Sequence, residues 1–144
     1  DHGRLAATSR YVLNLGPIDL SRRGTKTFKM MNLPETSFVI GIEIIFAPQD
    51  RATIETQAIS STVLLKLSGV NGQVLFMKKS ELDKWTWSKL ANEYRVFIYG
   101  RSENGTYFQP QRNTEYALTI SVLEPDPAQV KHSALLLAKS GGWK

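Results

Sequence analysis

The stretch 38 FVIGIEIIF 46 places an apolar side chain at every second position, at Phe38, Ile40, Ile42, Ile44 and Phe46. Successive side chains of a β-strand point to opposite sides, so a period of two predicts a strand with one buried face. Glu43 is among the residues between them, on the side that this pattern assigns to the other face.

A second alternating stretch, residues 116–122, predicts another strand of the same kind, with Ala117, Thr119 and Ser121 facing outward. Residues 63–68 alternate as well, and Asn71-Gly72 then leads into residues 73–77. Asn-Gly favours a type I′ hairpin turn, because both residues tolerate positive φ. A two-residue loop there would place Leu67 opposite Phe76, with both side chains on one side.

Shorter patterns extend this arrangement. Residues 11–15 and 25–30 are expected to be edge strands, with turn signals at Gly16-Pro17 and Arg23-Gly24. Asn104-Gly105 predicts a second hairpin, which joins 94–101 to 106–108. The prolines of 124 EPDP 127 end the strand before them, and residues 134–138 form the C-terminal strand.

Residues 80–91 are ambiguous, because they fit a short helix or irregular turn, and also a strand with Trp85 and Trp87 on one side. Strands without alternating helices predict an antiparallel sheet arrangement. We therefore expect an all-β fold: a single antiparallel β-sandwich of about eight or nine strands over residues 10–144, with at most one short helix near residues 81–91. Residues 1–9 are expected to be a disordered N-terminal segment.

Composition excludes several kinds of chemistry. The chain has 144 residues, which suits one domain, and no cysteine, which removes disulfides, thiol nucleophiles and cysteine-bound metals. No apolar run is long enough to span a bilayer. The net charge is +5, yet residues 31–130 hold nine basic and eleven acidic residues. The basic excess lies towards the ends of the chain, so nucleic acid is not an expected partner.

Catalysis has little support in the sequence. The two histidines, His2 and His132, are both expected to be exposed and idle, and no nucleophile elbow, phosphate loop or metal-binding spacing is present. We expect no enzyme activity, no cofactor and no metal site. The alternative is a glycoside hydrolase that uses Glu81 or Asp83, since these acids lie beside two tryptophans.

Aromatic residues are the strongest binding candidates. A ligand or partner surface is predicted from residues that cluster in the second half of the chain: Trp85, Trp87, Tyr99, Tyr107 and Arg101. Tryptophan is usually largely buried, so core packing of Trp85 and Trp87 is the competing interpretation. Trp143 is expected to dock against the sandwich.

The order of these features resembles a family of uncharacterised small bacterial exported proteins and lipoproteins. The motifs that carry the resemblance follow the strand at 38–46 and are 85 WTWS 88, 97 FIYG 100, 124 EPDP 127 and 140 SGGWK 144. The resemblance implies a bacterial envelope or periplasmic location, and it is compatible with lipid anchoring through a cysteine upstream of Asp1. It supplies no catalytic residue.

The sequence thus predicts a non-enzymatic binding or interaction module of the cell envelope, with a protein or a glycan as its ligand. Besides the hydrolase, an immunity-type or inhibitor protein that binds a toxin or an envelope hydrolase remains open, because an inhibitor needs only a complementary surface.

Overall fold

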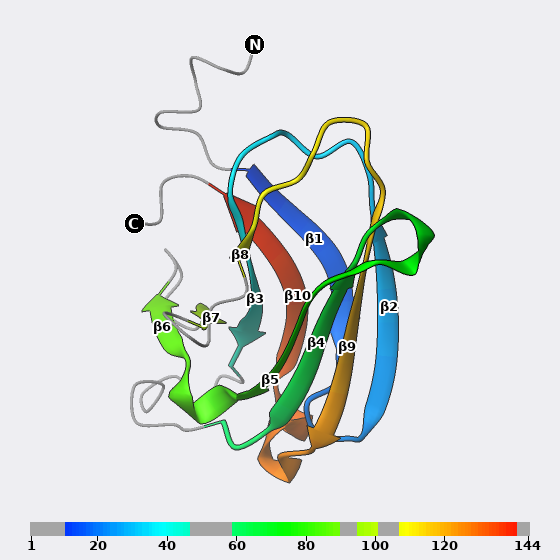
Figure 1. Ribbon diagram of the computed structural model, residues 1–144. Coiled ribbons are helices and arrows are strands. Elements are labelled where there is room, and N and C mark those ends of the chain that lie inside the picture. The colour runs from blue at the N-terminus through cyan, green and yellow to red at the C-terminus, as the bar shows by residue number, and fades with distance from the viewer. Residues whose placement is uncertain (1–10, 47–58, 90–94, 101–106, 141–144) are drawn as a thin grey trace.

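Strand β3 (Phe38–Ile45) lies inside the first of two antiparallel sheets in the computed structural model, which describes residues 11–46, 59–89, 95–100 and 107–140. This sheet, called sheet A, has the order β1 (Tyr11–Ile18), β10 (Ser133–Ser140), β3, β7 (Arg95–Tyr99) and β6 (Thr86–Lys89). The short strand β8 (Tyr107–Phe108) also pairs with β3. The second sheet, sheet B, has the order β2 (Gly24–Met30), β9 (Tyr116–Glu124), β4 (Thr62–Ser68) and β5 (Val74–Glu81). The sheets face each other (Figure 1), which confirms the predicted antiparallel sandwich.

The core lies between the sheets, where the predicted alternation places it. In β9 buried and half-buried residues alternate along the strand, and in β4 the inward residues Val63, Leu65 and Leu67 have no exposed surface. Ile40, Ile42 and Ile44 of β3 meet them from sheet A. Burying one such aliphatic side chain contributes about 1.5–3 kcal/mol, so this layer is the main source of stability.

The β4–β5 hairpin forms where it is predicted, but not through a two-residue turn. The Gly69 N–H donates to the Gln73 carbonyl at 2.7 Å and the Gly72 N–H to the Gly69 carbonyl at 3.2 Å, so the turn is centred on Val70 and Asn71. Leu67 lies opposite Phe76 as expected, and the register then shifts between Leu67 and Ser68. The Asn-Gly pair thus located the hairpin, because Asn71 and Gly72 do adopt positive φ values of 68° and 76°, whereas the length of the loop differs from the prediction.

The two predicted edge strands are also confirmed, because β1 ends sheet A and β2 ends sheet B. Gly16-Pro17 is not a turn, however. Strand β1 continues through it to Ile18 with a bulge between Asn14 and Gly16, and Gly16 has φ 150°. A bulge absorbs the unusual backbone of glycine without ending the strand.

The second predicted hairpin is wrong. Strand β7 pairs with Gly41–Ile45 and β8 with Phe38 and Val39, so both lie along β3 and do not form the second hairpin. Asn104-Gly105 itself is outside the described residues. The ambiguous stretch contains a 3₁₀ turn, η3 (Leu82–Lys84), followed by strand β6, and two other 3₁₀ turns are described at Val70–Gly72 and Pro127–Lys131. The short helix or irregular turn expected near 81–91 is thus a single 3₁₀ turn, and a strand follows it.

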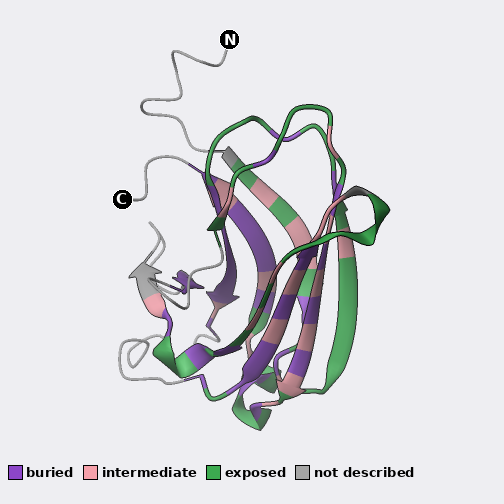
Figure 2. Ribbon diagram, in the orientation of Figure 1, coloured by how far each residue is buried: buried purple, intermediate pink, exposed green. Residues whose placement is uncertain are grey.

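Strand β3 also departs from the prediction of one buried face. Seven of its eight residues are buried, and Glu43 is only 7% exposed. Val39 joins Phe97, Tyr99 and Leu137 in a second apolar cluster on the side of sheet A that faces away from sheet B. Figure 2 shows β3 and β10 buried along most of their length, while β2 is largely exposed.

Candidate functional site

Among the described residues, the members of the predicted aromatic surface do not share one exposed face. Trp85 is 4% exposed and belongs to the main core, so its assignment to an exposed surface is wrong. Its position explains this: η3 carries the chain from sheet B to sheet A, and Trp85 follows directly as the chain crosses the open edge between the sheets. Core packing, the competing interpretation, holds for this ring.

Tyr99 belongs to a different apolar cluster from Trp85. Tyr99 is 9% exposed and stacks on Phe97 with 5.5 Å between ring centroids, on the outer side of sheet A. Tyr107 is exposed. Trp87 belongs to β6, where its backbone pairs with Ile98 of β7. Its side chain is not described, and Arg101 and Trp143 lie outside the described residues. Among the described aromatic candidates, only Tyr107 presents an exposed ring.

The two candidate acids lie at the β5–η3 junction. Glu81 forms an exposed ion pair with Lys84 at 2.7 Å between Nζ and Oε1. The hydrogen bond with Lys84, followed by the charge of that ammonium group, lowers the pKa of Glu81. A general acid of a glycosidase needs a raised pKa, so this environment does not suit Glu81 for that role. Asp83 is exposed on the adjacent turn.

A buried polar cluster closes one end of the sandwich. The carboxylate of Asp126 accepts hydrogen bonds from the backbone N–H groups of Ser60 and Ala128, both at 3.1 Å, and from Nε2 of Gln129 at 3.3 Å. Its own N–H donates to the carbonyl of Leu20 at 2.9 Å, and the Ser61 hydroxyl donates to the same carbonyl at 3.0 Å. Asp126 thereby ties the corner between β9 and the 3₁₀ turn at Pro127–Lys131 to the β1–β2 connection and to the start of β4.

Asp126 also positions the first turn of η5 (Pro127–Lys131). It is the N-cap residue, and Pro127 follows at the position where a helical turn tolerates proline. Because a carboxylate only accepts, the Gln129 amide must turn its NH₂ group towards Asp126, which fixes the position of its oxygen. That oxygen, Oε1, is buried and has no hydrogen-bond partner in the structure.

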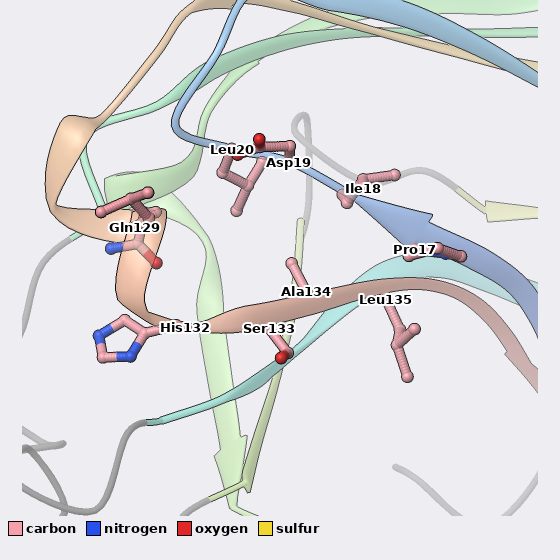
Figure 3. Close-up of a pocket in the computed structure, with 10 residues that line it drawn as sticks. Pro17, Ile18, Asp19, Leu20, Gln129, His132, Ser133, Ala134 and Leu135 are labelled. Carbon is pink, nitrogen blue, oxygen red and sulfur yellow. The ribbon is translucent and has the colours of Figure 1, made fainter.

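A pocket of about 390 Å³ lies beside this cluster, where β1 leaves sheet A and β10 enters it. Its wall contains the apolar residues Pro17, Ile18, Leu20, Val130, Ala134 and Leu135 and the polar residues Asp19, Gln129, His132 and Ser133. Figure 3 shows the Gln129 amide oxygen on the side facing the strand of Ala134, with Asp19 on the opposite rim. We call this the amide pocket.

His132 is half-buried, whereas the sequence predicts an exposed residue, and its ring lies 4.6 Å from that of Phe46, measured between centroids. Because η5 ends at Lys131 and β10 begins at Ser133, His132 stands at the corner between them, on the wall of the amide pocket. The Asp-Pro pair at 126–127 was a sequence signal for this corner, but its contact with Leu20 is non-local.

A second pocket, of about 210 Å³, opens between the edges of β1 and β2. Three basic residues, Arg22, Arg23 and Lys26, line it together with the apolar side chains of Ile18, Ile120 and Val122. Lys26 points inward from β2, because its register partner is the core residue Ile120, and its Nζ donates to the Pro17 carbonyl at 2.9 Å. We call this the basic pocket.

Asp19 stands between the two pockets and lines both. Its Oδ1 accepts from the Ser21 hydroxyl at 2.5 Å and from the Ser21 N–H at 2.9 Å. These two hydrogen bonds, with smaller contributions from the charges of Arg22 and Lys26, lower the pKa of Asp19. The carboxylate is therefore ionised at neutral pH, and one of its oxygens already accepts hydrogen bonds from Ser21 in the same turn.

Other site types have no support in the described part of the chain. It contains no group of three side chains suited to hold a metal ion. None of its helical turns has the length and apolar character to cross a membrane.

Comparison with known proteins bears on the fold alone. No family model matches the chain, and no curated protein matches it in sequence. A solved protein from Sulfurospirillum deleyianum has a similar structure, with a TM-score of 0.56 and 10% identity over 96% of this chain and 100% of that one. A part of the insecticidal delta-endotoxin Cry8Ea1 from Bacillus thuringiensis aligns with a TM-score of 0.42 and 13% identity, over 88% of this chain and 20% of the toxin. The sandwich is thus shared with the first protein at an identity that says nothing of function.

Proposed function

We propose that this protein is a non-enzymatic binding module and that its ligand enters the amide pocket. The observation that carries the proposal is Gln129, a residue that lines the pocket, whose amide is oriented by Asp126 and whose buried oxygen is left without a hydrogen-bond partner. A buried acceptor without a partner costs about 1–3 kcal/mol. A ligand that donates a hydroxyl or N–H hydrogen bond to this oxygen recovers that free energy.

The size and the walls of the pocket favour a small polar ligand, such as the end of a glycan, over a protein surface. Ligand pockets range from about 300 to 1,000 Å³, and the amide pocket, at about 390 Å³, belongs to that class. A sugar presents hydroxyl groups at its rim and an apolar face of C–H groups, which matches the mixture of Asp19, Gln129 and Ser133 with Ile18 and Ala134. A protein partner would instead cover about 800 Å² of surface.

Binding should be visible at Gln129 itself. Because its Oε1 is shielded from solvent, a donor reaches it only when the ligand enters the pocket and displaces a neighbouring side chain. We expect the side-chain NH₂ resonance of Gln129 to shift in ¹⁵N-edited NMR spectra during titration with a panel of soluble glycans. The substitution His132→Phe keeps the aromatic contact with Phe46 and removes the ring nitrogens, so it should weaken binding without unfolding the protein.

Tyr107→Ala is the matched control, since Tyr107 is the exposed aromatic residue of the predicted surface. It should leave binding unchanged. If Tyr107→Ala abolishes glycan binding while His132→Phe has no effect, the ligand uses the aromatic residues and the amide pocket is not the site. If no glycan in the panel moves the Gln129 resonance, the proposal is wrong.

A bacterial envelope location belongs to the same proposal and is supported by the family resemblance in sequence. The residues that precede Asp1 in the natural precursor test it. A hydrophobic segment that ends at a small-residue site and a cysteine would agree with export and lipid anchoring, whereas a preceding cytosolic domain would contradict them.

A further inference from the structure

We propose that the basic pocket binds an acidic group of the same ligand, so that the protein selects acidic saccharides. This inference rests on the proposed function and extends it from the amide pocket to its neighbour. The two pockets have Ile18 and Asp19 in common, so a ligand longer than one sugar ring can occupy both.

Positive charge exceeds negative charge on the wall of the basic pocket, where Arg22, Arg23 and Lys26 face Asp19. Neither Arg22 nor Arg23 forms an ion pair with any carboxylate in the described ranges, and both side chains are exposed. Asp19 is the acidic residue on the pocket wall, and its Oδ1 already accepts two hydrogen bonds from Ser21. Two guanidinium groups therefore keep their donors available beside one partly satisfied carboxylate.

The geometry of the pocket keeps these charges together. Lys26 is anchored by its hydrogen bond to the carbonyl of Pro17 in β1, which links the edges of the two sheets beside the basic pocket. The turn that carries Arg22 and Arg23 is held on its other side by the Ser21–Asp19 contacts and by the bond between Asp126 N–H and the Leu20 carbonyl. An oxyanion that enters thus meets a turn tied at both ends, which lowers the entropy cost of binding.

The chemistry of arginine favours a planar oxyanion, because its fork of N–H groups pairs with a carboxylate through two parallel hydrogen bonds. Ile18, Ile120 and Val122 supply an apolar floor of the kind that the C–H face of a sugar ring covers. Single-stranded nucleic acid would require aromatic side chains for base stacking, and the lining of this pocket contains none. A uronic acid residue carries both a carboxylate for the arginines and an apolar C–H face for the floor of the pocket.

Isothermal titration calorimetry with galacturonate tetrasaccharide tests the inference, with the neutral galactose tetrasaccharide as the matched ligand. The double variant Arg22→Gln/Arg23→Gln should bind the acidic ligand roughly 10- to 100-fold more weakly and lose most of the salt dependence of binding. The neutral ligand should bind both proteins alike. Lys29→Gln/Lys66→Gln removes the same charge from sheet B outside the basic pocket and should change the affinity for the acidic ligand less than twofold.

Three outcomes overturn the inference. Equal losses in the two double variants would mean that net charge alone drives binding. Equal binding of both tetrasaccharides, unchanged by Arg22→Gln/Arg23→Gln, would refute the acidic subsite and leave the amide pocket intact. Binding of inorganic phosphate or of phosphatidylserine vesicles that depends on both arginines, without binding of either saccharide, would assign the site to phosphates and would also reject the proposed function.

Discussion

The outer faces of the two sheets differ sharply in polarity. On sheet A, Val39, Phe97 and Leu137 are at most 4% exposed, and the ammonium group of Lys139 lies 4.2 Å from the centre of the Phe97 ring. On sheet B, hydroxyl pairs join β2 to β9 across the surface, Thr25 with Ser121 and Thr27 with Thr119, each at 2.9 Å. An alternating strand pattern therefore identifies which side chains share a face, but it does not say whether the second face meets water.

The largest expected effect on stability comes from adding a side-chain carbon to β3 at Gly41. A Cβ at Gly41 would overlap the Phe97 ring and lie 2.5 Å from the Ile98 carbonyl oxygen. The backbone of a central strand cannot move away without breaking its ladder, so Gly41→Ala should lower the free energy of unfolding by about 3 kcal/mol. On β2 of sheet B, a Cβ at Gly24 meets nothing within 4 Å. Gly24→Ala should change stability by less than about 0.5 kcal/mol in the same urea titration, and equal effects at the two glycines would contradict the comparison.

Leu137→Ala tests whether the outer side of sheet A acts as a core. Leu137 is 4% exposed, so its truncation should cost about 2–3 kcal/mol, as it would in the main core. Chemical denaturation of this variant beside Leu136→Ala, which truncates the neighbouring residue on the inner face, measures the difference directly. If Leu137→Ala, but not Leu136→Ala, lowers the free energy of unfolding by less than about 1 kcal/mol, the outer side of sheet A is accessible to solvent and is not a core.

The hydroxyl pairs of sheet B should matter much less. Thr27 and Thr119 are directly opposite in the register and hydrogen-bonded. A double-mutant cycle with Thr27→Ala and Thr119→Ala should give a coupling free energy of about 0.5 kcal/mol, because water competes for an exposed hydroxyl pair. A coupling as large as the loss at Leu137 would show that the two outer faces are energetically alike.

The smallest expected effect is a pH dependence at the edge that joins the two sheets. The folded-state pKa of Asp19 is lowered by Ser21, so its contribution is present above the ordinary pKa near 4 and is lost as the pH falls through the lowered value. The stability difference between the wild type and Asp19→Asn should be a few tenths of a kcal/mol at pH 7 and vanish near pH 2. In a Ser21→Ala background this difference should shrink, since the hydroxyl is the largest cause of the shift. A difference that persists unchanged at low pH would contradict this assignment.

Much of the fold could be predicted because its signals are local. Alternation located β3, β4 and β9, and Asn71-Gly72 marked the position of a hairpin through its preference for positive φ. The C-terminal strand was predicted as well, but nothing in its apolar composition indicates that it lies between β1 and β3.

The candidate site was harder to predict because its parts are distant in sequence. The amide pocket combines residues 17–20 with residues 129–135, and the buried acceptor of Gln129 arises from a carboxylate that also serves Ser60. The sequence analysis assigned aromatic residues to a binding surface because large rings are typical of binding sites. Trp85 is instead enclosed where the chain crosses between sheets.

The sequence by itself determined that this protein is a cysteine-free antiparallel β-sandwich, since periodicity, turn residues and composition act over a few neighbouring positions. Only the tertiary structure decided that the outer side of sheet A is apolar and buried, that Trp85 belongs to the core, and that Arg22 and Arg23 share a pocket with Ile120. These properties depend on which strands become neighbours, and strand order follows from the packing of the whole chain rather than from any one segment.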